Sequence, residues 1–279
     1  YINLMRGKIS GSIVIYKNDL TLLQNAVESF LRSTDGSMLY LIDNSPTDKL
    51  AAHFQHSRIK YIFNNKNIGF GAGHNLALKR VIETSESEYH VVLNPDVYFD
   101  REAMIRVHQY AENHPKVGLV MPKVLYPDGR LQPLCKLLPT PLTLFTRRFL
   151  QFYPSWLNRL NHWYEMHFSG YDKVMEVPFL SGCFMFLRVD ALREVGLFDE
   201  RIFLYTEDTD LTRRIHRKYR TIYYPEAIIY HYHQRDSYKN ALRLLHHVAG
   251  AIRYFNKWGW FNDHERKHIN KRIIVKFTE

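Results

Sequence analysis

The chain has 279 residues, of which 46% are hydrophobic and 24% charged, and this balance excludes the disordered, collagen-like and low-complexity classes. Its formal net charge of +10 indicates either a generally basic surface or attraction to an anionic partner: a phosphate-bearing substrate, a phospholipid surface or nucleic acid. Cys135 and Cys183 are too few for a disulfide framework and lack zinc-site spacing, which favours a reducing, cytoplasmic compartment.

No run of about 18 apolar residues occurs, and the N-terminal stretch has no apolar signal-peptide core. We therefore expect a protein that does not cross a membrane by itself. Met5 lies close behind Tyr1, and the sequence does not decide whether the first residues are native.

The first half of the chain alternates short β-rich runs with helical patterns, which predicts an α/β fold with a mostly parallel sheet. A strand over 12–16 precedes a helix whose apolar residues recur at helical spacing, with a capping box at Thr21 and Gln24. The next predicted elements are strands at 39–42, 60–63 and 89–93 and a helix at about 74–82.

Two of these strands end on an acid. Asp43 follows the second strand, and Asp96 follows the fourth after Pro95, which cannot donate a ladder hydrogen bond. Ligands of open α/β sheets bind beyond the carboxyl ends of the strands, so the two acids together indicate a site. Taken singly, each acid is equally explained by a turn or a helix cap.

The regular pattern breaks down between 135 and 172, where prolines and aromatic residues are frequent. The part from Leu142 to Leu157, with Arg147 and Arg148 inside it, fits either a surface that meets a membrane or lipid-linked substrate, or an excursion packed on the body. The later predicted elements are strands at 176–180 and 183–187, a helix at about 207–218, short strand-like runs at 221–224 and 228–232, and an amphipathic helix at about 238–258.

Four motifs, in this order, resemble the inverting glycosyltransferases of family 2, in particular the rhamnosyltransferase-like members that build bacterial O-antigen and capsule. They are the strand 12–16 with Leu41-Ile42-Asp43-Asn44-Ser45, the segment 67–75, Leu93-Asn94-Pro95-Asp96, and the segment 203–211 with Arg214 behind it. The resemblance implies the GT-A fold over 1–236, with a donor half at about 1–122 and an acceptor half at about 123–236, and leaves 237–279 as a C-terminal helical extension.

A nucleoside diphosphate leaves readily only when its negative charge is compensated, and a divalent cation held by carboxylate oxygen is the usual means. The resemblance makes Asp96 the candidate ligand for Mg²⁺ or Mn²⁺ and adds His231, which follows the last predicted strand. The family has an acid where this chain has Asn94, whose amide can still accept a hydrogen bond from a metal-bound water. A histidine at position 231 is equally explained as a structural residue.

The remaining donor-side residues are expected to contact the nucleotide sugar. Glycines at 69, 71 and 73 let the backbone approach a ligand and free amides for anions ahead of the helix predicted near His74. Asp43 can accept a hydrogen bond from the imide N–H of uracil or thymine, so a dTDP- or UDP-sugar is expected. By resemblance, the nucleotide-sugar contacts are Ile15, Tyr16, Asp43, Asn44, Gly69, Phe70, Gly71, Asn75, Asn94 and Arg214.

Inversion requires a carboxylate that takes the proton of the acceptor hydroxyl as this oxygen attacks the anomeric carbon. Resemblance makes Asp208 the preferred base, with Glu207 as the alternative or as a neighbour that orients the acceptor. Arg214 is expected to hold this segment or the diphosphate. Acids at a helix start are also explained by capping and by the helix dipole.

The sequence thus predicts transfer of a sugar, by resemblance rhamnose from dTDP-rhamnose, to a hydroxyl of a polysaccharide or lipid-linked glycan precursor. Basic charge, the aromatic stretch and the C-terminal amphipathic helix suggest peripheral attachment to an anionic membrane, the inner face of the cytoplasmic membrane. The alternatives are a sugar nucleotidyltransferase, which should carry a Gly-rich loop where this chain has Lys17-Asn18-Asp19-Leu20, a non-catalytic glycan-binding protein, and a basic nucleic-acid-binding protein, for which no reading motif is visible.

Overall fold

The computed structural model describes residues 9–149, 154–232 and 241–278. Within them, a mixed sheet of nine strands runs through the molecule. Its strands are β1 (Ile9–Ile15), β2 (Leu39–Asp43), β3 (Ile59–Phe63), β4 (Tyr89–Leu93), β5 (Val97–Tyr98), β6 (Val117–Leu125), β8 (Met175–Glu176), β10 (Phe184–Arg188) and β11 (Arg220–His231).

The strand order is β3-β2-β1-β4-β10-β6-β11-β5, and β8 also pairs with β11. The strands β3, β2, β1 and β4 run parallel, β10 is antiparallel to both of its neighbours, and β6 and β11 are parallel again. A separate small sheet joins β7 (Cys135–Lys136) to β9 (Phe179–Leu180). This mixed α/β architecture confirms the predicted fold class.

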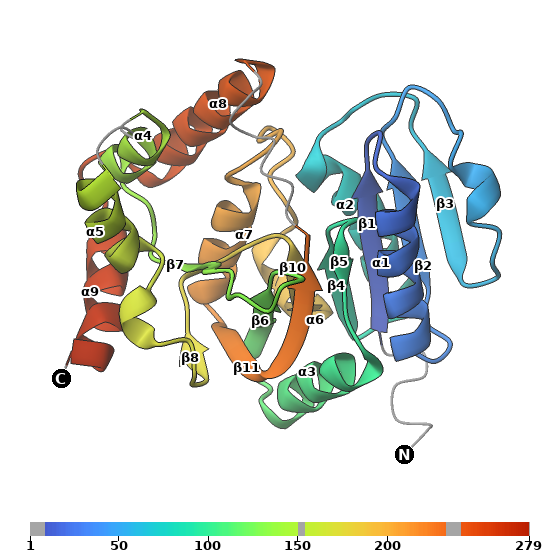
Figure 1. The fold of residues 1–279 in the computed structure, drawn as a ribbon, viewed down its shortest axis with the longest axis horizontal. Helices are drawn as coiled ribbons and strands as arrows, with labels where there is room; N and C mark the ends of the chain where they lie inside the picture. The colour runs from blue at the N-terminus through green and yellow to red at the C-terminus, as the bar shows by residue number, and fades with distance from the viewer. Residues whose placement is uncertain (1–8, 150–153, 233–240, 279) are drawn as a thin grey trace.

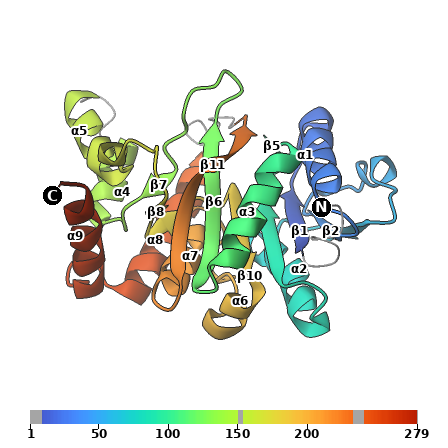
Figure 2. The same cartoon turned by 90° about the horizontal axis from the view of Figure 1, so that it is seen from below.

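Helices cover both faces of the sheet. They are α1 (Leu20–Ser33), α2 (Phe70–Thr84), α3 (Arg101–Asn113), α4 (Pro141–Phe149), α5 (Pro154–Tyr164), α6 (Val189–Val195), α7 (Glu207–His216), α8 (Ala241–Trp258) and α9 (His264–Thr278), with single 3-10 turns at Ala51–His53 and His167–Ser169. α1 and α3 pack together on one face, and α2, α6 and α7 lie on the other (Figure 2). α4, α5, α8 and α9 gather at the end of the molecule farthest from β3 (Figure 1).

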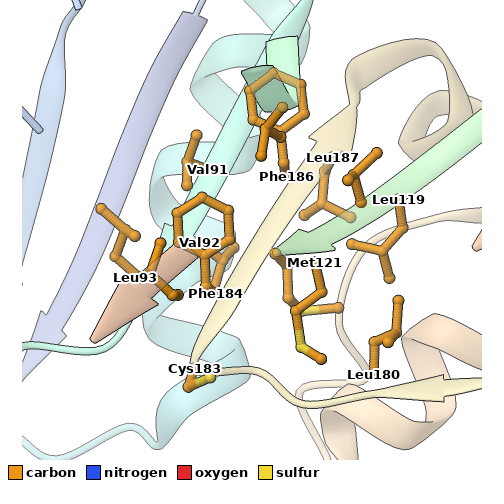
Figure 3. Close-up of a cluster of buried hydrophobic side chains, with 14 of the residues drawn as sticks. Val91, Val92, Leu93, Leu119, Met121, Leu180, Cys183, Phe184, Phe186 and Leu187 are labelled. Carbon is orange, nitrogen blue, oxygen red and sulfur yellow. The ribbon is translucent and has the colours of Figure 1, made fainter. Parts of the chain in front are cut away.

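The core is densest where β4, β10 and β6 meet. Side chains of these strands, among them Val91, Phe186 and Leu119, are at most 1% exposed and form one cluster (Figure 3). Every residue of β2 and β4 is buried, because helices cover both faces of these strands. Strands buried on both faces are mostly apolar runs in the sequence, which is why these two were predictable.

The starts of two helices differ from the sequence prediction. α1 is capped by the side chain of Asp19, which accepts from the amide of Leu22, so the capping box at Thr21 and Gln24 was wrong. α2 begins at Phe70 rather than near His74. Its first turn contains glycine because the packing there leaves no room for a side chain: a Cβ on Gly71 would lie 2.8 Å from Cβ of Phe198.

Proline explains two further differences. The strand predicted over 176–180 is divided into β8 and β9, which belong to different sheets, on either side of Pro178, which has no amide hydrogen for a ladder. The runs predicted at 221–224 and 228–232 form the single strand β11, whose register shifts between Tyr224 and Ile228, around Pro225.

Three other regions are more regular than predicted. The stretch 135–172 contains α4 and α5, and the sequence between Asp96 and Cys135, for which no element was predicted, contains α3 and β6. The C-terminal extension contains two helices, α8 and α9, and residues 238–240 of the predicted amphipathic helix lie outside the described residues. Among the described helices, none is both long and apolar enough to span a membrane.

Candidate active site

The parallel half of the sheet brings the predicted strand-end residues to one edge. Asp43 closes β2, and the turn Asn94-Pro95-Asp96 follows β4 directly. The amide of Asn94 donates to the carbonyl of Cys183, 2.9 Å away, which fixes this turn against the start of β10. The turn therefore ends one strand and meets the antiparallel strand beside it.

Asp96 and His231 lie side by side, although 135 positions separate them in the sequence. The antiparallel pairing of β5 with β11 aligns His231 with Val97, and Nε2 of His231 is 3.2 Å from Oδ1 of Asp96. The other ring nitrogen, Nδ1, lies 3.0 Å from Oε1 of Gln132, and the Gln132 amide also donates to the His231 carbonyl. Gln132 thus fixes the orientation of the imidazole ring.

This pair fits a divalent cation. Adjacent ligands of an octahedral ion with bonds of about 2.1 Å are about 3.0 Å apart, close to the separation of the two side chains. The side chain of Asp96 is 18% exposed, so its oxygen is reachable from solvent. No group of three or more His, Cys, Asp or Glu side chains gathers within the described ranges, so the other ligands would be diphosphate oxygens and water, as is usual for Mg²⁺.

Asp208, in the first turn of α7, is bound to the segment 181–183, which precedes β10. The amide of Gly182 donates to Oδ2 of Asp208 at 2.9 Å, and the amide of Thr209 donates to Oδ1 at 2.7 Å. Because Cys183 in turn binds the amide of Asn94, two adjacent residues connect the predicted base to the predicted metal turn. Asp208 and the turn that bears Asp96 are therefore both bound to the residues that precede β10.

The two acids of the Glu207-Asp208 pair have different surroundings. Glu207 is 4% exposed, and its Oε2 is buried with no hydrogen-bond partner among the described residues. Burial, reinforced by the charge of Asp208, raises the pKa of Glu207 well above its ordinary value. Burial also raises the pKa of Asp208, against the opposing effects of the Gly182 amide and the Lys136 ammonium group. A raised pKa makes Asp208 a stronger proton acceptor, and its side chain is only partly buried.

Phe70, a predicted donor contact, adjoins this acid. A Cβ on Gly182 would lie 3.3 Å from both the Phe70 ring and the Asp208 side chain, so Phe70 and Asp208 meet at a position that only glycine fits easily. The amide of Phe70 donates to the carbonyl of Phe203 at 3.1 Å. The start of α2 is therefore bound to the segment that leads into α7.

The predicted base-binding residues surround the ends of β1 and β2. Ile15 is fully buried, whereas Tyr16 is 46% exposed. Asp43 is also fully buried and accepts from the Ser45 amide and from the hydroxyl of Tyr61. Asn44, 1% exposed, donates to the carbonyl of Gly69 and so connects this edge to α2. Tyr16 is thus the side chain of this group that offers an open surface.

The glycines and Asn75 of the third motif have packing roles. A Cβ on Gly73 would meet Val14 at 2.7 Å, and one on Gly69, whose φ is +93°, would meet the carbonyl of Phe203 at 2.6 Å. Asn75 is 1% exposed and bonds through its amide to both backbone groups of Phe198. These contacts join α2 to the loop after α6, and contact of this motif with a nucleotide stays a prediction.

Arg214 holds the segment before α7. Its guanidinium group donates to the carbonyls of Val195, Gly196 and Leu197 and to Asp210, one turn earlier on α7. Only the contact with Asp210 lies within the motif 203–211, and both expected roles, holding the segment of Glu207 and Asp208 or the diphosphate, stay predictions. Asp210 also accepts from Trp258 Nε1, so α8 contributes to the same cluster.

Sequence reasoning missed Gln132 and underrated Gly182. Gln132 lies in a stretch without a predicted element. No local pattern indicates its contact with His231, 99 positions away. Gly182 stands before a predicted strand, where a glycine most often marks a turn. Its close approach to Asp208 and Phe70 depends on three separate segments, so no signal in the sequence could have revealed it.

Comparison with known proteins identifies the family and the fold. The model of a family described as glycosyltransferase-like family 2 matches residues 14–247. The chain is 27% identical over 226 residues to N-acetylglucosaminyl-diphospho-decaprenol L-rhamnosyltransferase of Mycobacterium tuberculosis, over 76% of this chain and 72% of the relative.

Solved structures share the fold. A mannosyltransferase of Pyrobaculum calidifontis in complex with GDP-Man and Mn²⁺ superposes with a TM-score of 0.58 at 16% identity, over 90% of this chain and 65% of that one. GalNAc-T7 with UDP, GalNAc and Mn²⁺ superposes with a TM-score of 0.59 at 12% identity. That match covers 80% of this chain but only 43% of the GalNAc-T7 chain, and at such identities it concerns the fold alone.

Proposed function

Because the chain belongs to the glycosyltransferase-like family 2 and is therefore a glycosyltransferase, we propose that it transfers a sugar from a nucleoside diphosphate donor, with inversion, to a hydroxyl of a glycan precursor. The observation that carries this proposal is the pair of contacts made by the segment 181–183. Gly182 binds Asp208, and Cys183 binds the turn that bears Asp96. The proposed proton acceptor and the turn that bears the proposed metal ligand are thus both bound to one short segment, which would bring donor and acceptor together for in-line displacement.

On the donor side, Asp96 and His231 would hold Mg²⁺ or Mn²⁺, with Gln132 orienting the imidazole ring. A divalent cation bound there supplies the positive charge that compensates the departing diphosphate. Asn94, whose amide nitrogen is 3.4 Å from Nε2 of His231, lies close enough to contact a ligand of that ion. Two solved structures that share the fold contain Mn²⁺ together with a nucleotide, which supports the choice of ion.

On the acceptor side, Asp208 would take the proton from the attacking hydroxyl. The hydrogen bonds from the amides of Gly182 and Thr209 fix the orientation of its carboxylate, so that a substrate hydroxyl meets a positioned oxygen. Glu207 is only 4% exposed, so a substrate hydroxyl reaches it less easily than the partly buried Asp208, and it is better suited to shaping the site.

The sugar and the acceptor are proposed from the relative in Mycobacterium tuberculosis, whose name specifies an L-rhamnosyl group and an N-acetylglucosaminyl-diphospho-decaprenol. For this chain we infer dTDP-rhamnose as the donor, and a glycan precursor linked to a lipid through a diphosphate as the acceptor. The base would lie at the β1–β2 edge, where the exposed Tyr16 ring offers a stacking surface, and contact with the fully buried Asp43 would require this carboxylate to exchange its hydrogen bond from Tyr61.

Peripheral contact with an anionic membrane follows from the same acceptor. Large apolar side chains are exposed on neighbouring helices at one end of the molecule, including Leu142 and Phe145 on α4 and Leu245 on α8, at 63%, 55% and 65%. Together with the net charge of +10, this surface suits a membrane that carries lipid-linked substrates.

A thermal-shift screen of nucleotide sugars with and without Mn²⁺, followed by a transfer assay with the best donor, tests the proposal. We expect the largest stabilisation with a dTDP-sugar and Mn²⁺ together, and none with Mn²⁺ alone at the same concentration. Stabilisation by no nucleotide sugar, with or without the ion, would contradict the proposed function. A larger effect of UDP- or GDP-sugars would contradict the choice of base.

A further inference from the structure

A cavity of about 190 Å³ opens beside the first turn of α7, on the acceptor side of Asp208. Its wall comes from segments far apart in the sequence: β7, α4, α5, β9, the segment 205–209 and α8. Thr206 and Thr209, which line it, flank the predicted base on either side along the chain. The cavity therefore adjoins the place where the acceptor hydroxyl would react.

The wall of this cavity is cationic. Lys136, Arg147 and Arg148 line it, together with His247, whose pKa is lowered by burial and by these three cations. Arg147 is paired with Glu165 at 2.7 Å, so part of its charge is already compensated. No carboxylate within the described ranges comes within ion-pair distance of Lys136, whose ammonium group lies 5.1 Å from the Phe179 ring centre. Burial and the nearby Arg147 lower the pKa of Lys136, and an anion in the cavity would relieve both effects.

One residue of the cavity wall, Thr206, carries a buried hydroxyl. Thr206 is 3% exposed, and its Oγ1 finds no hydrogen-bond partner in the part of the chain that the structure describes. Helix α8 comes close to this hydroxyl because Gly250 has no side chain: a Cβ there would lie 3.0 Å from Oγ1 of Thr206. A buried donor without a partner is costly unless a ligand or water completes it.

The helices α4 and α8, which contact each other, both contribute to the cavity wall, through Arg147, Arg148 and His247. The same two helices expose large apolar side chains: Leu142 and Phe145 on α4, and Leu245 and Val248 on α8. A cationic pocket bordered by helices with exposed apolar side chains matches a ligand that has a phosphate head and a hydrocarbon tail.

We propose that this cavity binds the diphosphate that joins the acceptor sugar to its lipid, with Lys136 and Arg148 as the principal cationic contacts and the lipid leaving over α4 and α8. This inference rests on the proposed function, and it assigns the acceptor subsite that function needs. Lys136 is close enough to Asp208 for each charge to affect the pKa of the other. A sugar attached to a diphosphate at Lys136 therefore lies beside the base.

The test measures binding of farnesyl diphosphate, a soluble prenyl diphosphate without sugar, by calorimetry on the full chain. We expect Lys136→Met and Arg148→Met each to weaken this binding by about tenfold or more, because a charge-assisted contact is lost. The matched control is Arg159→Met, which removes an exposed cation of α5 outside the cavity wall and should leave binding unchanged. Binding of dTDP with Mn²⁺ should be the same in all of these variants.

Three outcomes would overturn the proposal. One is wild-type affinity for farnesyl diphosphate in both cavity variants. Another is an equal loss of dTDP binding in these variants, which would assign the cations to the donor. The third is a result that contradicts the path of the lipid over α4 and α8. Such a result is equal affinity of the wild type for inorganic pyrophosphate and farnesyl diphosphate, or unchanged affinity of Phe145→Ser for farnesyl diphosphate. Binding of dTDP is measured separately. Failure of the proposed function would therefore appear as the absence of dTDP binding in the wild type.

Discussion

Arg213 and Asp263 form a two-pronged ion pair inside the molecule, with nitrogen–oxygen distances of 2.7 and 2.8 Å. Their side chains are only 1% and 2% exposed. Burial by itself would raise the pKa of Asp263, but the hydrogen bonds from Arg213 and from the amide of Arg266 lower it overall. Since Arg213 belongs to α7 and Asp263 precedes α9, the pair joins the helix that begins with Glu207 and Asp208 to the C-terminal helices.

Removing the arginine should destabilise the fold. In Arg213→Met the buried carboxylate of Asp263 loses its two-pronged partner and keeps the amide of Arg266 and, at 3.8 Å, the guanidinium group of the same residue. We therefore expect the free energy of unfolding to fall by about 3–5 kcal/mol. The double variant Arg213→Met/Asp263→Leu should lose less than the two single variants added together. Urea denaturation measures all three. Arg32→Met, which removes an exposed pair with Glu28, is the control and should change stability by less than about 1 kcal/mol. An equally small loss in Arg213→Met would contradict this role.

Asp208→Asn should keep donor binding and lose transfer. Asparagine has the same shape and can still accept from the Gly182 amide, but it cannot take a proton, so turnover should fall about 10²- to 10⁴-fold. Initial rates of sugar transfer and calorimetric titration with the donor nucleotide measure the two effects separately. Glu207→Gln is the comparison: because burial raises the pKa of Glu207 well above its ordinary value, the amide resembles the protonated acid, and turnover should fall far less. The reverse ranking would identify Glu207 as the base.

Asp96→Ala should abolish the effect of metal on nucleotide binding. We expect Mn²⁺ to strengthen dTDP binding in the wild type and to have almost no effect in the variant, because the oxygen ligand is gone. Gln132→Ala, which only frees the imidazole ring of His231, should weaken the apparent affinity for Mn²⁺ by about 10- to 100-fold. Calorimetry over a range of Mn²⁺ concentrations measures both. As a control, Asp128→Ala removes an exposed acid and should behave as the wild type. Identical metal dependence in Asp96→Ala and the wild type would refute the assignment.

Stability should decrease as the pH falls below about 6.5 because the pKa values of two buried histidines, His74 and His90, are lowered. Ser12 bridges Nδ1 of His74 and Nε2 of His90, at 2.7 Å from each. Burial lowers the pKa of His90 to about 3, and burial together with His90 lowers that of His74 well below its ordinary value. Between about pH 6.5 and the lowered pKa values of the folded chain, the unfolded chain binds protons that the folded chain does not. Acid therefore favours unfolding by up to about 1.4 kcal/mol per pH unit for each histidine.

Urea midpoints between pH 7.5 and 4.5 measure this dependence. His90→Gln should start from a lower stability but show a shallower decrease with acid, since one of the two buried histidines is absent. A slope identical to that of the wild type would mean that His90 does not control the acid sensitivity.

The sequence determined the parallel half of the sheet and the order of the motifs. Strands such as β4, buried on both faces, are mostly apolar runs, and Pro95 marks the end of that strand without reference to any other part of the chain. The positions of Asp43, Asp96 and Asp208 at the ends of elements follow from such local signals. The ends of these strands and helices depend on residues close to them in the sequence, so the sequence alone was enough to predict them.

Only the tertiary structure decided which of these residues meet. Gln132 contacts His231, Gly182 contacts Asp208, and Asn75 bonds to Phe198, across separations of 99, 26 and 123 positions. Likewise the cationic cavity combines Lys136 with Arg148 and His247 from two helices that the sequence did not place together. Such contacts are set by how strands pair and helices pack, and neither periodicity nor spacing along the chain specifies those long-range choices.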